Sequence, residues 1–245
     1  HRAYDLLFRY APDARAEAGP LLDRAAALDP SSARIAAAQS FLAWQEAFFE
    51  VSADPGRDVR RAIEMAERAV ALDPLDPQGR LALGRAARLI PDLDFAAEEL
   101  EAAVALNPSF AAAHYALGSC LKFMSRLEEA VATVERARRI SPYDPMTFSF
   151  MSLLAELHGL LGDTAASVKW AKRAARSPQS HYNILAIVAW CHWRAGERDA
   201  ARTYLAEVLR RRPGYSRAAY FRAFPFRGEE RDLIDETLGA MGLPA

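Results

Sequence analysis

The 245-residue sequence predicts an all-α fold: a right-handed superhelical solenoid of antiparallel helix pairs. Three observations lead to this prediction. Prolines recur at a nearly constant interval, and small and apolar residues recur within each interval at the spacing of one helix face. In addition, no stretch alternates between apolar and polar residues over a useful length, which argues against strands. We expect about five to six hairpins followed by a C-terminal capping helix.

The interval is read from prolines that follow an apolar residue and a polar or acidic one. Pro74 lies 44 residues after Pro30, and the next two intervals, to Pro108 and Pro142, are 34 residues each. Pro178 and Pro213 continue the series at 36 and 35 residues. A period near 34 is typical of repeats built from helix pairs. Because proline cannot extend the helix that precedes it, each of these residues marks a turn into the next hairpin.

Small residues in the repeat indicate where the two helices of a hairpin cross. Gly84 and Gly118 lie early in their units, and Ala96 and Ala130 lie near the middle. Side chains of this size allow two helix backbones to approach closely. The larger apolar residues between them recur every three or four positions, so they form one buried face.

The repeat divides the chain into a single array from residue 1 to residue 245. It begins with a degenerate leading hairpin, Arg2–Tyr10 with Ala14–Leu28. The first full hairpin contains an aromatic helix, Ser32–Val51, and an enlarged turn, Ser52–Asp58, which explains its longer interval. Glu229–Ala240 has one apolar side and an acidic remainder, as a capping helix requires. The predicted segments are 1–30 (leading hairpin), 31–74, 75–108, 109–142, 143–178 and 179–213 (full hairpins), and 214–245 (capping tail).

The pattern Leu117-Gly118, Ala130, Val134, Ala137 and Pro142 resembles the tetratricopeptide repeat (TPR) family. The layout of the whole chain is similar to the C-terminal TPR region of bacterial class III adenylate/guanylate cyclase-like proteins. Related arrays follow winged-helix domains in transcriptional regulators. The segments that carry this second resemblance are Ala3-Tyr4-Asp5-Leu6-Leu7, Ser141-Pro142-Tyr143-Asp144-Pro145 and Phe224-Pro225-Phe226-Arg227. It implies a non-catalytic regulatory scaffold in a bacterial cytoplasmic signalling protein, with a catalytic domain such as a nucleotidyl cyclase preceding His1.

Composition narrows the range of partners. The formal net charge of −1 provides no general field to attract nucleic acid or an anionic membrane. The longest apolar stretch, residues 184–193, is ten residues long, whereas a membrane span needs about 20. Two widely separated cysteines match no metal or redox spacing and favour a reduced, cytoplasmic setting. No phosphate loop, metal motif or other cofactor motif is visible. The sequence therefore predicts no nucleic acid, no membrane, no cofactor and no catalytic residue.

The first helices of stacked hairpins line a concave groove, where such arrays bind a protein or an extended peptide. Aromatic and arginine side chains are typical of binding hot spots. The residues predicted to form the partner-binding groove are Arg85, Arg88, Tyr115, Lys122, Trp190 and Trp193.

Three alternatives accompany this prediction. The tryptophans could instead fill gaps between hairpins. The array could associate with copies of itself, as a homo-oligomer. The chain could be an enzyme with chemistry near Cys191 and His192, although His192 occupies a repeat position that usually holds a large packing residue.

Overall fold

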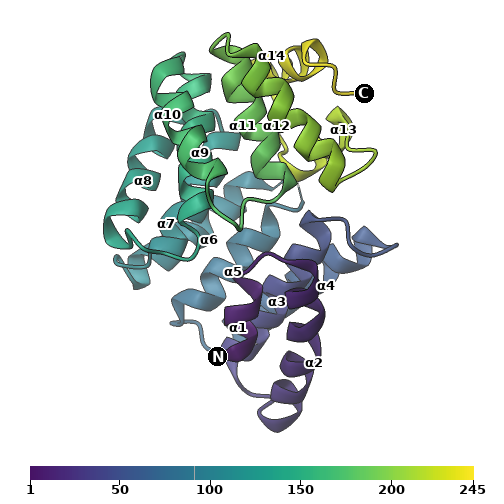
Figure 1. The fold of residues 1–245 in the computed structure, drawn as a ribbon. Helices are drawn as coiled ribbons and strands as arrows, with labels where there is room; N and C mark the ends of the chain where they lie inside the picture. Colours follow the sequence, from purple (N-terminus) through teal and green to yellow (C-terminus); the bar gives the residue numbers. More distant parts are fainter. Residues whose placement is uncertain (91) are drawn as a thin grey trace. The chain divides into compact units, whose positions relative to one another are not determined.

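The structure is a computed structural model that describes residues 1–90 and 92–245. These residues contain fourteen α-helices and no β-strand (Figure 1). The predicted all-α class of antiparallel helix pairs is confirmed. The chain divides into two compact units, His1–Cys120 (unit 1) and Leu121–Ala245 (unit 2). In the described part of the chain, no helix is both long enough and apolar enough to cross a membrane.

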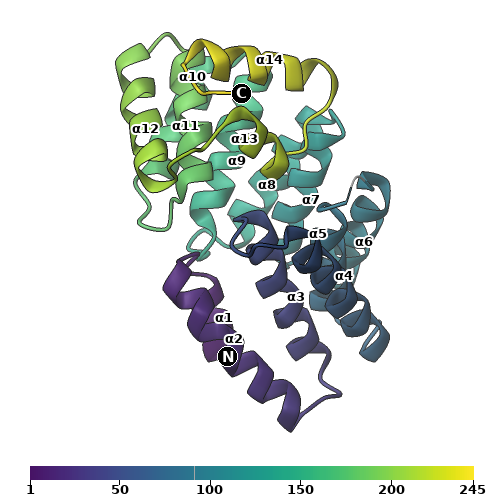
Figure 2. The ribbon, with the colours of Figure 1, turned by 90° about the vertical axis from the view of Figure 1, so that its right-hand side faces the viewer.

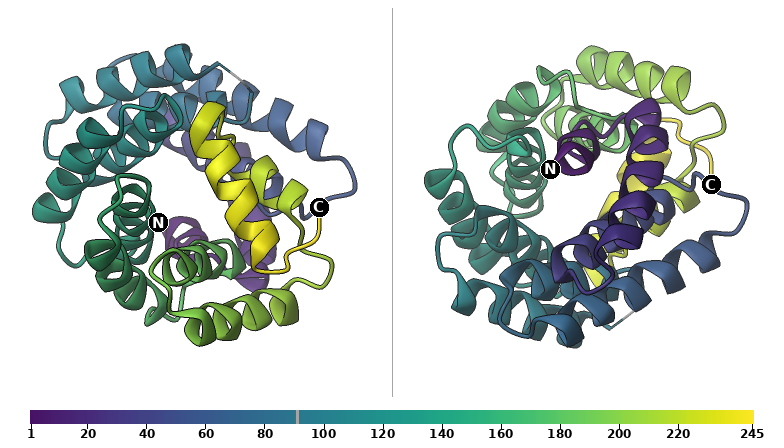
Figure 3. Two further views of the ribbon diagram at one scale, coloured as in Figure 1. Left: turned by 90° about the horizontal axis from the view of Figure 1, so that it is seen from above. Right: turned by 90° about the horizontal axis from the view of Figure 1, so that it is seen from below.

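Unit 1 consists of helix pairs that follow one another along the chain. In each of the pairs α1/α2, α3/α4 and α5/α6 the two helices pack together, and α3 also packs against α5. Figure 3 shows the paired helices from above and from below. The helices are α1 (Arg2–Leu7), α2 (Pro12–Leu28), α3 (Ala33–Phe48), α4 (Pro55–Leu72), α5 (Pro77–Ala87), α6 (Leu93–Leu106) and the first part of α7 (Ala111–Phe123).

Aspartates start several of these helices. The side chain of Asp54 accepts a hydrogen bond from the backbone N–H of Arg57 (2.9 Å), and Asp76 and Asp92 cap α5 and α6 in the same way. Pro55, which follows Asp54, already has the φ angle of a first helical residue. The turn predicted to extend to Asp58 therefore ends at Asp54, and this part of the prediction was wrong.

The predicted close crossing at Gly84 is confirmed. A Cβ atom at this position would lie 2.6 Å from Cγ of Leu100 and 2.9 Å from the carbonyl oxygen of Ala96. Both of these residues are on α6. Helices α5 and α6 thus approach each other at a distance that leaves no room for a side chain at residue 84.

Unit 2 contains the end of α7 and seven further helices. Helices α9 and α10, and then α11 and α12, form antiparallel pairs, and α9 also contacts α11 (Figure 2). Helix α14 packs against α11 and corresponds to the predicted capping helix. The short helix α13 within the predicted tail was not foreseen. The helices are α8 (Leu127–Ile140), α9 (Thr147–Leu160), α10 (Thr164–Ala175), α11 (Tyr182–Arg194), α12 (Arg198–Arg211), α13 (Arg217–Ala223) and α14 (Gly228–Ala240).

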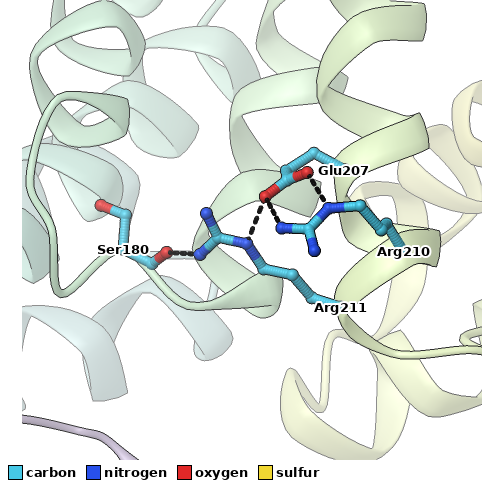
Figure 4. A network of polar contacts seen from close by, with 4 residues as sticks. All are labelled: Ser180, Glu207, Arg210 and Arg211. Atoms are coloured by element: carbon cyan, nitrogen blue, oxygen red, sulfur yellow. Dashed lines mark hydrogen bonds and ion pairs between the residues drawn. The ribbon is translucent and has the colours of Figure 1, made fainter.

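A polar network connects the C-terminal end of α12 to the turn before α11 (Figure 4). Arg210 and Arg211 both donate hydrogen bonds to the carboxylate of Glu207, at 2.6 to 2.7 Å. Arg211 also donates to the carbonyl oxygen of Ser180 (2.8 Å). These hydrogen bonds lower the pKa of Glu207 to about 2. The arginines that end this helix are thus engaged by its own acidic side chain and by a neighbouring turn.

Candidate partner-binding surfaces

The first helix of each pair contributes to one face of its unit, which we call the first-helix face. In unit 1 this face is formed by α1, α3 and α5, which contact one another in turn, and by the start of α7, where Tyr115 acts on Arg85. In unit 2 it is formed by α9 and α11, which are in contact, and by the end of α7, where Lys122 pairs with Glu156. All six residues predicted to bind a partner lie on α5, α7 or α11, or at the C-terminal end of one of these helices. The structure divides them between the two units: Arg85, Arg88 and Tyr115 in unit 1, and Lys122, Trp190 and Trp193 in unit 2.

Arg85 is a buried cation surrounded by aromatic rings. Its guanidinium carbon lies 4.3 Å from the centre of the Phe41 ring and 5.6 Å from the centre of the Trp44 ring, which is cation–π geometry. Only 7% of the residue is exposed, and burial lowers the pKa of its side chain. No carboxylate of the described residues lies within ion-pair distance of it.

A small cavity adjoins this guanidinium. It has a volume of about 40 Å³, and its walls include Tyr4, Phe8, Phe41, Gln78 and Arg85. A cation, an amide and a tyrosine can all donate hydrogen bonds, whereas no acidic side chain of the described residues lines the cavity. The surroundings of Arg85 therefore suit a small anionic group.

Arg88 and Tyr115 lie near Arg85 in the same unit. Arg88 follows Arg85 by one helical turn at the C-terminal end of α5, and both Arg88 and Tyr115 are half-buried. Burial is the main cause of a lowered pKa at Arg88, and Tyr115 interacts electrostatically with both arginines. The structure thus brings the three predicted residues of unit 1 together.

Lys122, in unit 2, is already engaged by its own chain. Its ammonium group forms an ion pair with the carboxylate of Glu156, and the two side chains are 2% and 0% exposed. The hydroxyl of Tyr220 donates a hydrogen bond to the other oxygen of that carboxylate (2.6 Å). Burial next to this carboxylate raises the pKa of Tyr220 well above its ordinary value. Lys122 is therefore not an open surface residue, because α9 and α13 cover it.

Aromatic rings from the C-terminal tail complete this cover. The ammonium nitrogen of Lys122 lies 4.4 Å from the centre of the Phe123 ring, 5.3 Å from that of Phe224 and 4.6 Å from that of Phe226. The rings of Phe123 and Phe226 meet edge to face, with their centres 5.0 Å apart. Sequence reasoning noted the Phe224-Pro225-Phe226 motif without recognising that it contacts the first-helix face.

The two tryptophans of α11 occupy different environments. Trp190 is fully buried, and a Cβ atom at Gly159 of α9 would lie 2.5 Å from its ring. It fills the space between α9 and α11, as the gap-filling alternative describes. Trp193 is half-buried, and the guanidinium carbon of Arg198 lies 4.0 Å from the centre of its ring. With side chains of α14 it lines a cavity of about 230 Å³.

The region around Cys191 and His192 lacks the features of a reactive thiol. Burial raises the pKa of Cys191 to about 12, whereas nucleophilic cysteines have a lowered pKa. Nδ1 of His192 lies 2.8 Å from a carboxylate oxygen of Glu197, and its ring stacks on that of Tyr204. Across the described residues, no group of three or more His, Cys, Asp and Glu side chains is placed to hold a metal ion.

Comparison with known protein families supports the repeat that the sequence predicts. Residues 56–100 and 92–145 match the tetratricopeptide repeat model. Residues 56–145 carry tetratricopeptide repeats. Proteins of this family are in general non-catalytic and bind protein or peptide partners. No curated protein is similar enough in sequence to match the chain.

Solved structures have the same fold at low sequence identity. PilF of Pseudomonas aeruginosa is 20% identical, with 84% of this chain and 87% of that chain covered and a TM-score of 0.57. A thermophilic TPR protein of Thermus thermophilus is 19% identical, with 82% and 100% covered and a TM-score of 0.58. A chain of the APC/C hetero-tetramer Cut9–Hcn1 is 17% identical, with 92% and 40% covered and a TM-score of 0.67. These similarities support the TPR-type solenoid fold.

Proposed function

We propose that the chain is a non-catalytic scaffold that binds a protein or an extended peptide through the first-helix face of unit 1. The observation that carries this proposal is Arg85, a buried guanidinium with no carboxylate partner among the described residues. Burying a charge without an ion-pair partner is unfavourable by roughly several kcal/mol. The cation–π contacts with Phe41 and Trp44 offset only part of this cost. A partner that supplies a carboxylate would offset this cost on binding.

The cavity and its surroundings define the partner's chemistry. A carboxylate from an acidic side chain or a chain end can pair with Arg85, in the cavity next to Tyr4 and Gln78. Arg88 and Tyr115 provide a second cation and a hydroxyl close by. We therefore expect an acidic residue flanked by apolar ones in the bound segment. The binding role of Trp193, which is half-buried in unit 2, stays a prediction.

The Arg85→Met variant distinguishes a role of Arg85 in binding from a role in stability. Methionine keeps most of the apolar length of the side chain and removes the charge. Peptides selected from a random display library on the immobilised full chain should bind this variant about thirtyfold more weakly, as truncated hot-spot residues typically do. Its melting temperature should be unchanged or raised, because the cost of burying the charge is gone and the methionine sulfur replaces the cation–π contacts by favourable contacts with the same rings.

The matched control is Arg60→Met on α4, a second helix of the same unit, where the arginine side chain is 74% exposed. This variant should bind the selected peptides normally. Normal binding by Arg85→Met together with weakened binding by Arg60→Met would place the interaction on the other face and overturn the proposal.

The cellular context rests on the resemblance of the chain's layout alone. We place the chain in the C-terminal region of a bacterial cytoplasmic signalling protein whose catalytic or DNA-binding domain precedes His1. The coding sequence upstream of His1 tests this directly, since it should encode a cyclase-like or winged-helix domain. Sedimentation of the chain as a dimer or larger assembly at micromolar concentration would favour the self-association alternative.

A further inference from the structure

The C-terminal segment Gly214–Arg227, here called the tail segment, crosses the first-helix face of unit 2. In a stack of hairpins each pair contacts only its neighbours. Helix α13 lies in the tail segment and follows α12 directly, so regular stacking would place it against the α11/α12 pair. Tyr220 nevertheless reaches Glu156 on α9, and Phe226 reaches Phe123 on α7. The tail segment therefore lies back across the earlier first helices instead of extending the stack.

The contacts involve polar groups on all three first helices of this face. Lys122 on α7 and Glu156 on α9 meet Tyr220 and the phenylalanines, as described above. On α11, the side-chain carbonyl of Asn183 accepts a hydrogen bond from the hydroxyl of Tyr215 (2.6 Å). The tail segment thus supplies tyrosine hydroxyls that donate to a carboxylate and an amide of the face. It also supplies aromatic rings that surround the ammonium group of Lys122.

The covered face is more polar than the other buried sides of the same helices. Lys122, Ser152, Glu156 and Asn183 are all at least 98% buried. Lysine and glutamate are almost never fully buried unless they are paired, as Lys122 and Glu156 are, and the buried stripe of a helix is usually apolar. The opposite sides of the same helices follow that rule, since Leu154 and Leu157 of α9 are completely buried.

A glycine begins the tail segment, and another glycine directly follows its last residue. Gly214 and Gly228 have φ angles of +79° and +57°, a conformation that favours glycine, and neither would have a contact at its Cβ position. Helix α14 has its own packing on α11, with Ile234 and Leu238 completely buried. Three contacts join the tail segment to α14 and the chain end: Arg217 pairs with Asp235 (2.8 Å), the backbone N–H of Arg217 donates to the carbonyl oxygen of Pro244 (2.7 Å), and Arg231 lies over the Phe221 ring. Release of the tail segment would break these contacts, whereas the packing of α14 on α11 would remain.

We propose that the first-helix face of unit 2 is a second peptide-binding surface, and that its resident ligand is the chain's own tail segment. A partner that binds there must present a tyrosine hydroxyl and two phenylalanine rings in similar order and must displace the tail segment. This inference is independent of the binding role of Arg85, because its residues belong to the other unit.

The test uses the full chain and a fluorescein-labelled synthetic peptide of residues 214–228. In the wild type the tethered tail segment competes at an effective concentration of the order of millimolar, so the peptide should bind weakly. The variant with Phe224→Ala and Phe226→Ala loses two aromatic anchors from the resident segment. Its affinity for the peptide should rise at least about thirtyfold over that of the wild type, the effect typical of one such anchor.

Three controls show whether the peptide binds at the same place. A peptide with the same composition in scrambled order should not bind. Adding Glu156→Gln to the double variant should weaken binding, because the acceptor for the tyrosine hydroxyl loses its charge. Arg85→Met should leave peptide binding unchanged, so a failure of the function proposed for unit 1 can be told apart from a failure here. Absence of peptide binding to the folded double variant would overturn the proposal.

Hydrogen exchange of the wild type provides a second measurement if the double variant does not fold. The amides of residues 217–226 should exchange well before those of α9, α11 and α14, because the segment opens locally. Exchange of all these amides together, only on global unfolding, would show that the tail segment is an integral part of the unit and would overturn the proposal.

Discussion

Trp190 tests whether a tryptophan on a first helix belongs to the core or to a binding surface. The side chain is 0% exposed, and a buried aromatic side chain removes about 150–250 Å² from water. At about 25 cal/mol per Å² this burial is worth about 4–6 kcal/mol. Measured losses for Trp→Ala in protein cores are similar, about 3–5 kcal/mol. Trp190→Ala should therefore lower the free energy of unfolding by about 3–5 kcal/mol.

The assay is thermal unfolding followed by circular dichroism at the helical band. For a chain of this size, each kcal/mol corresponds to about 2–4 °C, so the melting temperature should fall by about 6–20 °C. Trp193→Ala, on the same helix but half-buried, is the matched control and should cause a clearly smaller fall. Wild-type melting of Trp190→Ala together with loss of peptide binding would refute the reasoning and make Trp190 a binding residue.

Three further predictions concern other sites. Gly84→Ala should destabilise the fold by about 1–3 kcal/mol in urea unfolding, because its Cβ would clash with Leu100; a neutral effect would contradict the close crossing. The pKa of Glu197 is lowered from 4.5 mainly by its hydrogen bond with His192, so its stabilising contribution is present above pH 4.5 and is lost as the pH falls through the lowered value. Glu197→Gln should therefore unfold with a weaker dependence on pH below 4.5, and an unchanged profile would exclude this role. Cys191, with its pKa raised to about 12, should resist iodoacetamide at pH 8 until the chain unfolds, and rapid alkylation of the native chain would contradict its burial.

Local features of the fold were predictable because they depend on residues close together in the chain. Proline positions mark the ends of hairpins, and small residues such as Gly84 mark helix crossings. The enlarged turn was misjudged by a few residues, because Pro55 and Gly56 suggest a loop. In the structure they form the first turn of α4, since Asp54 caps the helix and Pro55 fits its first position.

The candidate site was predictable only as a set of side chains on the first helices. Arg85, Arg88 and Tyr115 lie together, as the repeat phase suggests. The same phase could not distinguish Trp190 from Trp193, because both lie on one helix turn and differ only in what packs over them.

The amino-acid sequence by itself determined the helical class, the repeat length and the residues on each first helix, because these follow from periodicity within about 34 residues. Only the tertiary structure decided which of those side chains are available to a partner. The pairing of Lys122 with Glu156 spans 34 residues, and that of Glu156 with Tyr220 spans 64. Contacts at such separations leave no local pattern in the sequence, since they depend on how the tail segment folds back over the completed stack.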